Sequence, residues 1–164
     1  MIYNPFLDEF FHGRRGQGAF LGRQRIRVSK TQALSRALLS TGFSYRKGEI
    51  RANLGRFRKL SLKARGIRRP GSAALDLAYV AAGRFDGFWE IGLSPWAAAA
   101  GRLIITEAGG RVTDLQGRKD PEGSAALVTS NGRIHRALVR ALAAACLVLA
   151  LAGSALAADD GILK

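Results

Sequence analysis

The sequence predicts an α/β protein of about one domain, and two observations carry this prediction. Short apolar segments punctuated by glycine alternate along the chain with alanine-rich segments of helical length. The 164 residues are 48% hydrophobic and 23% charged, a globular composition that excludes disordered, collagen-like and coiled-coil classes. A single cysteine, Cys146, and only two histidines, His12 and His135, exclude an intramolecular disulfide and a zinc site built from Cys and His.

The first 28 residues predict strands joined by tight turns. Short apolar stretches follow one another here with glycines between them, which is the pattern of strands linked by turns. The four stretches are residues 2–3, 9–12, 16–21 and 25–28. Because the first stretch follows Met1 directly, we expect that an upstream element for it to pair with is absent.

Residues 29–62 predict a turn, a strand and a helix. Ser29 is expected to cap a short helical turn, and the apolar run 37–43 is typical of a buried strand. Between residues 49 and 62, apolar side chains recur at spacings of three and four, as in an amphipathic basic helix. These side chains are Ile50, Leu54, Phe57 and Leu60.

The second half of the chain predicts helices and strands in turn. The small-residue segment 73–83 is typical of a helix closed by a C-terminal glycine, and Pro95 suits the first turn of a second alanine-rich helix. Residues 68–72 are predicted to be a loop. We expect helices at 73–83, 97–108 and from Arg133 onward, and strands at 85–91, 111–114 and 125–129.

The formal net charge of +14 belongs to one half of the chain. Residues 1–70 hold 17 Lys and Arg against three Asp and Glu, whereas residues 71–164 hold nine of each. The basic residues are scattered rather than gathered in a nucleic-acid-reading motif. A solvated basic face is therefore the favoured interpretation, and attraction to RNA or phosphate through residues 1–70 is the alternative.

Seven short glycine-, alanine- and aromatic-containing motifs follow one another along the chain, and their order is informative. They include Gly-Gln-Gly-Ala-Phe, Ser-Thr-Gly-Phe, Gly-Ser-Ala-Ala-Leu-Asp-Leu, Asp-Gly-Phe-Trp-Glu and Pro-Trp. Together they resemble the inositol monophosphatase family, over the span from about Tyr3 to about Leu142 and covering only the C-terminal portion of a family chain. The motifs lie at residues 16–20, 40–43, 71–77, 86–90, 95–96, 99–101 and 107–110.

The resemblance implies a fold, a reaction and a cofactor. The implied fold is the C-terminal part of a layered α-β-α-β-α sandwich, and the implied reaction is Mg²⁺-dependent hydrolysis of inositol or sugar monophosphates. The family's metal ligands are carboxylates, because Mg²⁺ prefers hard oxygen donors. Some come from upstream segments missing here, and another is the Asp after Pro-Trp, where this chain has Ala97. We therefore expect a fragment that binds no Mg²⁺ and is inactive.

The family's substrate-binding residues have counterparts in this sequence, whereas its metal ligands do not. By resemblance, Gly71, Ser72 and Ala73 at a helix start approach the substrate's ring hydroxyls, and Glu90 accepts hydrogen bonds from them. A turn at a helix N-terminus also offers unpaired N–H groups. The structural alternatives are a tight packing turn at 71–74 and a salt-bridging role for Glu90. Asp76 is expected to cap a neighbouring backbone group.

Other interpretations of the whole chain stay open. One is a non-enzymatic module that binds RNA or the transcription machinery, and another is a nonfunctional gene remnant. Trp96 is expected in the core, the two histidines in surface or half-buried structural roles, and Arg68 and Arg69 in pairs with a carboxylate or a second subunit. A homodimer and a cytoplasmic location are the remaining expectations.

The C-terminal tail differs from the rest of the chain. An apolar run, 141–152, follows three arginines and precedes small residues, which is the order found in a secretory signal peptide. We therefore divide the chain into residues 1–142, the phosphatase-like portion, and 143–164, an apolar signal-peptide-like tail. The alternative is an alanine-rich helix with a hydrophobic end. We expect residues 141–157 to pack poorly on the domain and to contact membranes nonspecifically.

Overall fold

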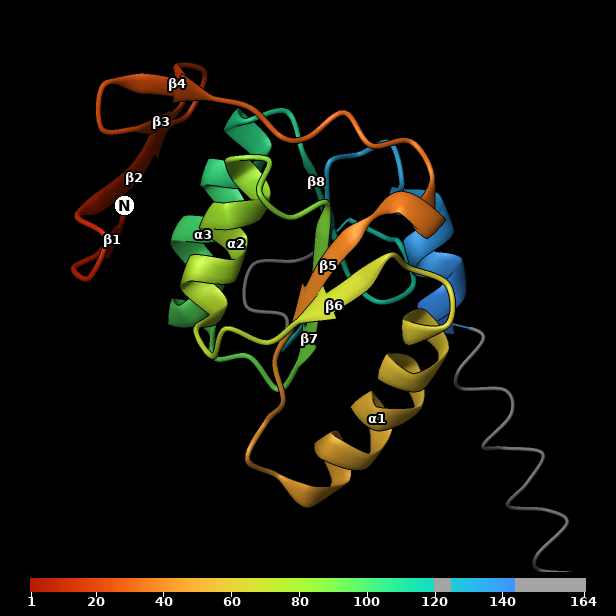
Figure 1. The fold of residues 1–164 in the computed structure, drawn as a ribbon. Coiled ribbons are helices and arrows are strands. Elements are labelled where there is room, and N and C mark those ends of the chain that lie inside the picture. Colours follow the sequence, from red (N-terminus) through yellow and green to blue (C-terminus); the bar gives the residue numbers. More distant parts are fainter. Residues whose placement is uncertain (120–124, 144–164) are drawn as a thin grey trace, which may run out of the picture.

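The computed structural model describes residues 1–119 and 125–143, and it contains two β-sheets with helices between and beside them (Figure 1). The α/β class predicted from the sequence is confirmed. The strands are β1 (Ile2–Asn4), β2 (Glu9–Arg14), β3 (Gly18–Leu21), β4 (Gln24–Ile26), β5 (Leu38–Thr41), β6 (Gly66–Arg68), β7 (Gly87–Ile91), β8 (Arg111–Thr113) and β9 (Ala126–Ser130). The helices are η1 (Leu34–Arg36), α1 (Lys47–Ser61), α2 (Ala73–Ala81) and α3 (Pro95–Glu107), and residues 135–143 are also helical.

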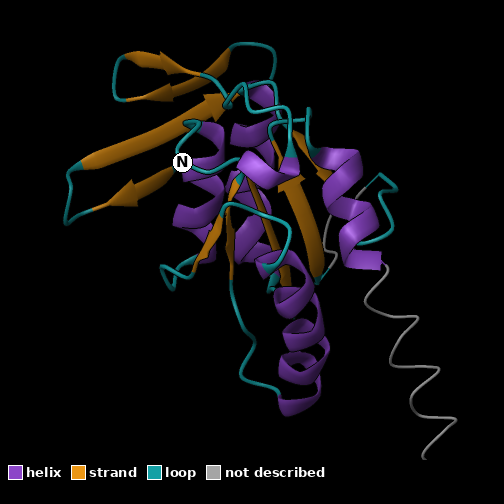
Figure 2. Ribbon diagram, turned by 45° about the vertical axis from the view of Figure 1, so that its right-hand side comes forward, coloured by secondary structure: helices purple, strands orange, loops and turns teal. Residues whose placement is uncertain are grey.

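The first sheet is an antiparallel meander in the order β1-β2-β3-β4 (Figure 2). Its inward side chains alternate with outward ones because successive residues of a strand point to opposite faces. Phe11 on β2 and Ala19 on β3 are fully buried against the helices, whereas Tyr3 and Phe10 are exposed on the other face.

The second sheet is mixed, in the order β6-β5-β7-β9-β8. Strand β5 pairs in parallel with both β6 and β7, and β9 pairs antiparallel with β7 and β8. Phe88 lies on the face toward α2 and α3, while its neighbour Trp89 lies on the opposite face. Both faces of this sheet are therefore covered, which accounts for its nearly continuous apolar strands.

Helices α2 and α3 fill the space between the two sheets. They approach closely at Gly101, where an added Cβ would lie 2.5 Å from two side-chain carbons of Leu77. The small residues that predicted these two helices are thus the residues that let them touch. The far face of the mixed sheet is covered by α1 and by residues 135–143, which bury Leu60 and Leu138.

The apolar face of α1 is rotated from the predicted one. Leu54 is 52% exposed, and Asn53 is buried in its place. The cause is the indole N–H of Trp89, which donates to the Asn53 side-chain oxygen at 2.7 Å. A buried indole needs an acceptor, so a polar residue takes the inward position.

Two local predictions are wrong. Ser29 does not cap a helical turn: η1 begins at Leu34, has no side-chain cap, and the Ser29 hydroxyl donates to Asp86 instead. Strand β6 was not predicted, because three residues next to Arg69 and Pro70 carry too little hydrophobic pattern to separate a strand from a loop.

The tail is described only at its start. Leu142 is fully buried and Ala141 is 5% exposed, so the expectation that packing fails from residue 141 is wrong for these two residues. The rest of the predicted tail, 144–164, lies outside the described residues. Among the helices that the structure describes, none is long and apolar enough to cross a membrane.

Candidate functional site

The candidate site lies where three neighbouring strands end. Because β6, β5 and β7 run parallel, their carboxyl ends meet at one edge of the sheet. Gly42 follows β5, the turn at Gly71 and Ser72 follows β6, and Glu90 lies near the end of β7. The sequence-predicted substrate residues are thus brought to one edge, the place where ligands bind in open α/β sheets.

Helices α2 and α3 begin at this edge, and so does α1, whose first-turn Glu49 lies against Gly92. Gly71 has a φ of +99°, a conformation that favours glycine, and Ser72 is the N-cap of α2 and accepts from Leu75 N–H at 3.4 Å. Helix α3 begins nearby with Pro95 in its first turn. The unpaired N–H groups and positive dipole ends of α2 and α3 therefore face the same region.

Glu90 is held against the backbone of the neighbouring strand. An added Cβ at Gly42 would lie 2.2–2.4 Å from the carboxyl atoms of Glu90, so any side chain there would displace the Glu90 carboxyl. Burial raises the pKa of Glu90 to about 7, and the nearby Arg69 guanidinium partly opposes the shift. At neutral pH the Glu90 carboxyl is therefore close to half-ionised, able to accept or donate a hydrogen bond to a hydroxyl.

Asp76 is on α2, near Glu90 of β7. It is 1% exposed, and neither of its carboxyl oxygens makes a hydrogen bond within the described structure, nor does the Ser40 hydroxyl. Burial raises the pKa of Asp76 to about 7; the nearby Ser40 hydroxyl lowers it, and the charge of Glu90 raises it further. The expectation that Asp76 caps a backbone group is wrong. A buried carboxyl, Asp76, and a half-buried one, Glu90, thus lie near enough for the charge of Glu90 to act on Asp76, which sequence patterns did not indicate.

The described residues supply no metal ligands at this edge. Ala97, in the first turn of α3, is partly buried against the core between the helices, and its methyl group offers no ligand. Residues 1–119 and 125–143 contain no cluster of three or more His, Cys, Asp or Glu side chains that could hold a metal. The described residues do not fit Mg²⁺, and the chemistry available at this edge is hydrogen bonding to a ligand.

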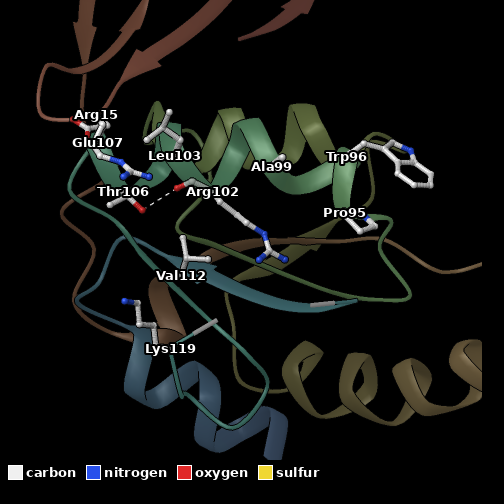
Figure 3. A pocket seen from close by; sticks show the side chains of 10 residues that line it. All are labelled: Arg15, Pro95, Trp96, Ala99, Arg102, Leu103, Thr106, Glu107, Val112 and Lys119. Atoms are coloured by element: carbon white, nitrogen blue, oxygen red, sulfur yellow. Dashed lines mark hydrogen bonds between the residues drawn. The ribbon is translucent and has the colours of Figure 1, made fainter. Parts of the chain in front are cut away.

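A separate groove runs along α3 (Figure 3). It encloses about 850 Å³ and meets the candidate site only at the start of the helix. Trp96 lines it and is 82% exposed, so the expectation of a core tryptophan is wrong. At the far end, Glu107 accepts hydrogen bonds from the N–H groups of Gly16 and Gly18, both 2.8 Å, which hold its pKa below the usual range. The groove is lined by Arg15, Pro95, Trp96, Ala99, Arg102, Leu103, Thr106, Glu107, Val112 and Lys119.

Both histidines are structural. His12 is half-buried and stacks on Phe20 with ring centroids 5.5 Å apart. His135 is buried between the hydroxyls of Thr113 and Ser130, each 2.9 Å from a ring nitrogen, and burial lowers its pKa to about 4. Arg69 lies over the Phe43 ring, 5.7 Å from its centroid, and near enough to Glu90 for its charge to act on that carboxyl.

The sequence profile of the inositol monophosphatase family matches residues 1–147. The chain belongs to this family. Inositol-1-monophosphatase of Mesorhizobium japonicum is 46% identical over 143 residues, which are 87% of this chain and 54% of that protein. Nus factor SuhB of Pseudomonas aeruginosa is 45% identical over 142 residues, which are 85% of this chain and 52% of that protein.

Solved structures agree with the fold. Inositol monophosphatase from Anabaena (Nostoc) sp. PCC 7120 superposes with a TM-score of 0.83 at 47% identity, over 86% of this chain and 56% of that one. The suhB protein of Bartonella henselae gives a TM-score of 0.81 at 46% identity, over 85% and 54%. The predicted inositol monophosphatase architecture is thereby confirmed. The chain spans about half the length of the relatives it matches.

Proposed function

We propose that this chain carries the polyol-binding part of an inositol- or sugar-phosphate phosphatase site and does not itself hydrolyse the phosphate ester. The main support is the placement of the Gly71–Ser72 turn, Ala73 and Glu90 at one edge of the sheet. Ring hydroxyls would meet backbone N–H groups on one side and the Glu90 carboxyl on the other. The absence of a ligand at Ala97 supports the lack of hydrolysis.

Hydrolysis and polyol binding can be measured separately. With Mg²⁺ and inositol 1-phosphate, the purified chain is expected to release no phosphate above background. With myo-inositol alone, backbone amide resonances of residues 71–73 should shift in a ¹H–¹⁵N NMR titration. Glu90→Gln should weaken this binding, whereas Glu9→Gln, at the opposite end of the fold in an exposed ion pair with Arg84, should not.

Two results would contradict this proposal. Chelator-sensitive phosphate release by the wild-type chain would show that a metal site is present. If myo-inositol leaves the amide resonances of residues 71–73 unchanged, these residues do not bind the polyol.

A second candidate is a non-enzymatic module that contacts RNA or the transcription machinery. Two observations favour it: several relatives bear the name Nus factor SuhB, and residues 1–70 hold 17 of the 26 basic residues. RNA affinity that falls steeply with rising salt would support this candidate, because phosphate contacts release counterions. Weak, salt-insensitive binding would count against it.

A further inference from the structure

A second polar cavity lies at the opposite end of the same parallel strands. It encloses about 890 Å³, and its lining comes from the segment before β5, the connection between α1 and β6, and the turn between α2 and β7. Arg36 lies just before β5, Arg65 just before β6, and Asp86 just before β7. The cavity therefore sits at the amino ends of the strands whose carboxyl ends form the candidate polyol site.

The lining of this cavity is strongly cationic. Lys30, Arg36, Arg65 and Arg84 all contribute to it, and Asp86 is its single carboxylate. Arg84 is neutralised by its ion pair with Glu9. The side chains of the other three cations are exposed and make no ion pair or hydrogen bond with the residues that the structure describes. Three positive charges, two from the segment before β5 and one from the connection between α1 and β6, thus face one cavity that holds a single carboxylate.

Asp86 offsets part of this charge from a position where it is turned inward and anchored. It is 7% exposed, and its two oxygens accept from the Ser29 hydroxyl and from Leu38 N–H at 2.7 Å. The carboxylate therefore acts as an anchor for the neighbouring backbone. Hydrogen bonds from neutral donors leave its negative charge in place, so one carboxylate stands against Lys30, Arg36 and Arg65, and the cavity keeps an excess of positive charge.

The segment that carries Lys30 is irregular but firmly held. Figure 1 shows it crossing over the fold, in orange, from β4 to β5. The Asn131 amide donates to the Ser29 hydroxyl at 2.9 Å and to the Thr31 carbonyl at 2.8 Å. On its other side, an added Cβ at Gly83 would lie 3.1 Å from Ser29 N. Lys30 and Arg36 are therefore presented by a preformed loop, which lowers the entropy cost of binding.

We propose that this cavity binds an anion carrying two or more phosphate groups, held by Lys30, Arg36 and Arg65. Spaced cations around a polar cavity match spaced phosphates, and guanidinium groups bind phosphate oxygens in pairs. The phosphates belong either to a small molecule or to a nucleic-acid backbone. The site is distinct from the polyol site and does not rest on the function proposed there.

The test uses two probes and the whole chain. Tripolyphosphate and a short oligouridylate are titrated by calorimetry into wild type, Arg36→Ala and Arg65→Ala. Each cavity substitution should weaken the tightest-binding probe about tenfold, the loss expected for one charge-assisted contact. Arg58→Ala is the matched control, because it removes the same charge from an exposed position on α1. It should change affinity less than about twofold.

The outcomes separate the two sources of phosphate. Cavity-dependent binding of tripolyphosphate assigns the site to a small molecule, and cavity-dependent binding only of oligouridylate assigns it to a nucleic-acid backbone. The proposal is overturned if neither probe binds, or if Arg58→Ala weakens binding as much as Arg36→Ala. Amide shifts in wild type give a check that needs no variant: the probe should move residues 29–36 and leave residues 71–73 unchanged.

Discussion

The two ends of β5, β6 and β7 differ in charge although they belong to the same three strands. The carboxyl ends bring together Glu90 and the buried Asp76, with Arg69 as the nearby cation. The amino ends face a cavity with three unpaired cations. A phosphate group without a bridging metal is repelled by carboxylates at the first end and attracted at the second. In this chain we therefore expect neutral polyols at one end and anions at the other.

Two buried aspartates, one near each end of these strands, differ in their hydrogen bonding. Asp86, at the amino ends, accepts from Ser29 and Leu38, whereas Asp76, near the carboxyl ends, has no hydrogen-bond partner within the described residues. A buried carboxylate stabilises a fold only when its oxygens are paired. The same Asp-to-Asn substitution is therefore expected to have opposite signs at the two positions.

The largest loss of stability is expected from Asp86→Asn. The amide offers one acceptor oxygen where the carboxylate offers two, so Leu38 N–H or the Ser29 hydroxyl loses its partner. The free energy of unfolding should fall by about 2 kcal/mol, measured by urea denaturation. The matched control is Asp8→Asn, which removes an exposed carboxylate and should change stability by less than about 0.5 kcal/mol. Equal losses in both variants would show that Asp86 is not an anchor.

Asp76→Asn should instead stabilise the protein at alkaline pH. The folded-state pKa of about 7 lies above the ordinary 3.8, so the folded state holds a proton that the unfolded state releases between these values. Stability from Asp76 is therefore present below about pH 4 and is lost as the pH rises toward 7. Removing the charge should restore about 1–3 kcal/mol at pH 8.

The pH profile of this difference provides the check. The gain from Asp76→Asn should shrink toward pH 4, where the wild-type carboxyl is protonated in both states. His135 acts in the opposite direction, because its lowered pKa of about 4 costs stability as the pH falls from about 6.5. Since His135 is present in both proteins, subtracting one profile from the other removes its contribution. A gain that is independent of pH would contradict the assignment to Asp76.

A smaller effect is expected from the ionisation of Glu90 on polyol binding. Because the pKa of Glu90 is about 7, the ionised acceptor becomes the main form only above neutral pH. Affinity for myo-inositol should rise by roughly threefold between pH 6 and 8, in line with one neutral hydrogen bond gained. The Glu90→Gln variant should give a flat profile. A wild-type profile that is equally flat would show that Glu90 does not contact the ligand.

Ala97→Asp is expected to have no effect on Mg²⁺ binding or phosphatase activity. One carboxylate restores a single ligand, and the described residues supply no cluster to join it. Mg²⁺ needs several oxygen ligands in near-octahedral geometry, so calorimetry should detect no Mg²⁺ binding and no phosphatase activity should appear. A measurable gain of either would mean that further ligands lie among residues 120–124 or 144–164.

Much of the fold was predictable because it rests on local pattern. The glycine-punctuated strands of the first sheet and the small-residue helices α2 and α3 were predicted close to their observed bounds. Their signals depend on turn chemistry and on helix periodicity, which a single segment carries by itself. The edge that joins the Gly71 turn to Glu90 was indicated by the family resemblance, and the parallel pairing supplies its physical reason.

Apart from the short strand β6, the main features missed by the sequence depend on partners far along the chain. Asn53 turns inward because of Trp89, 36 residues away, and Ser29 is engaged by Asp86, 57 residues away. The unpaired state of Asp76 and the cationic cavity follow from the packing of several elements. Such features have no local signal, so hydrophobic pattern and cap rules could not find them.

The Asn131 contacts have a consequence for how the protein folds. Asn131 follows β9 and holds Ser29 and Thr31, about 100 residues earlier in the chain. Closing so long a stretch costs entropy that is repaid only when the intervening strands are in place. The cationic cavity is therefore among the last parts of the molecule to take shape, after the sheet on which it stands.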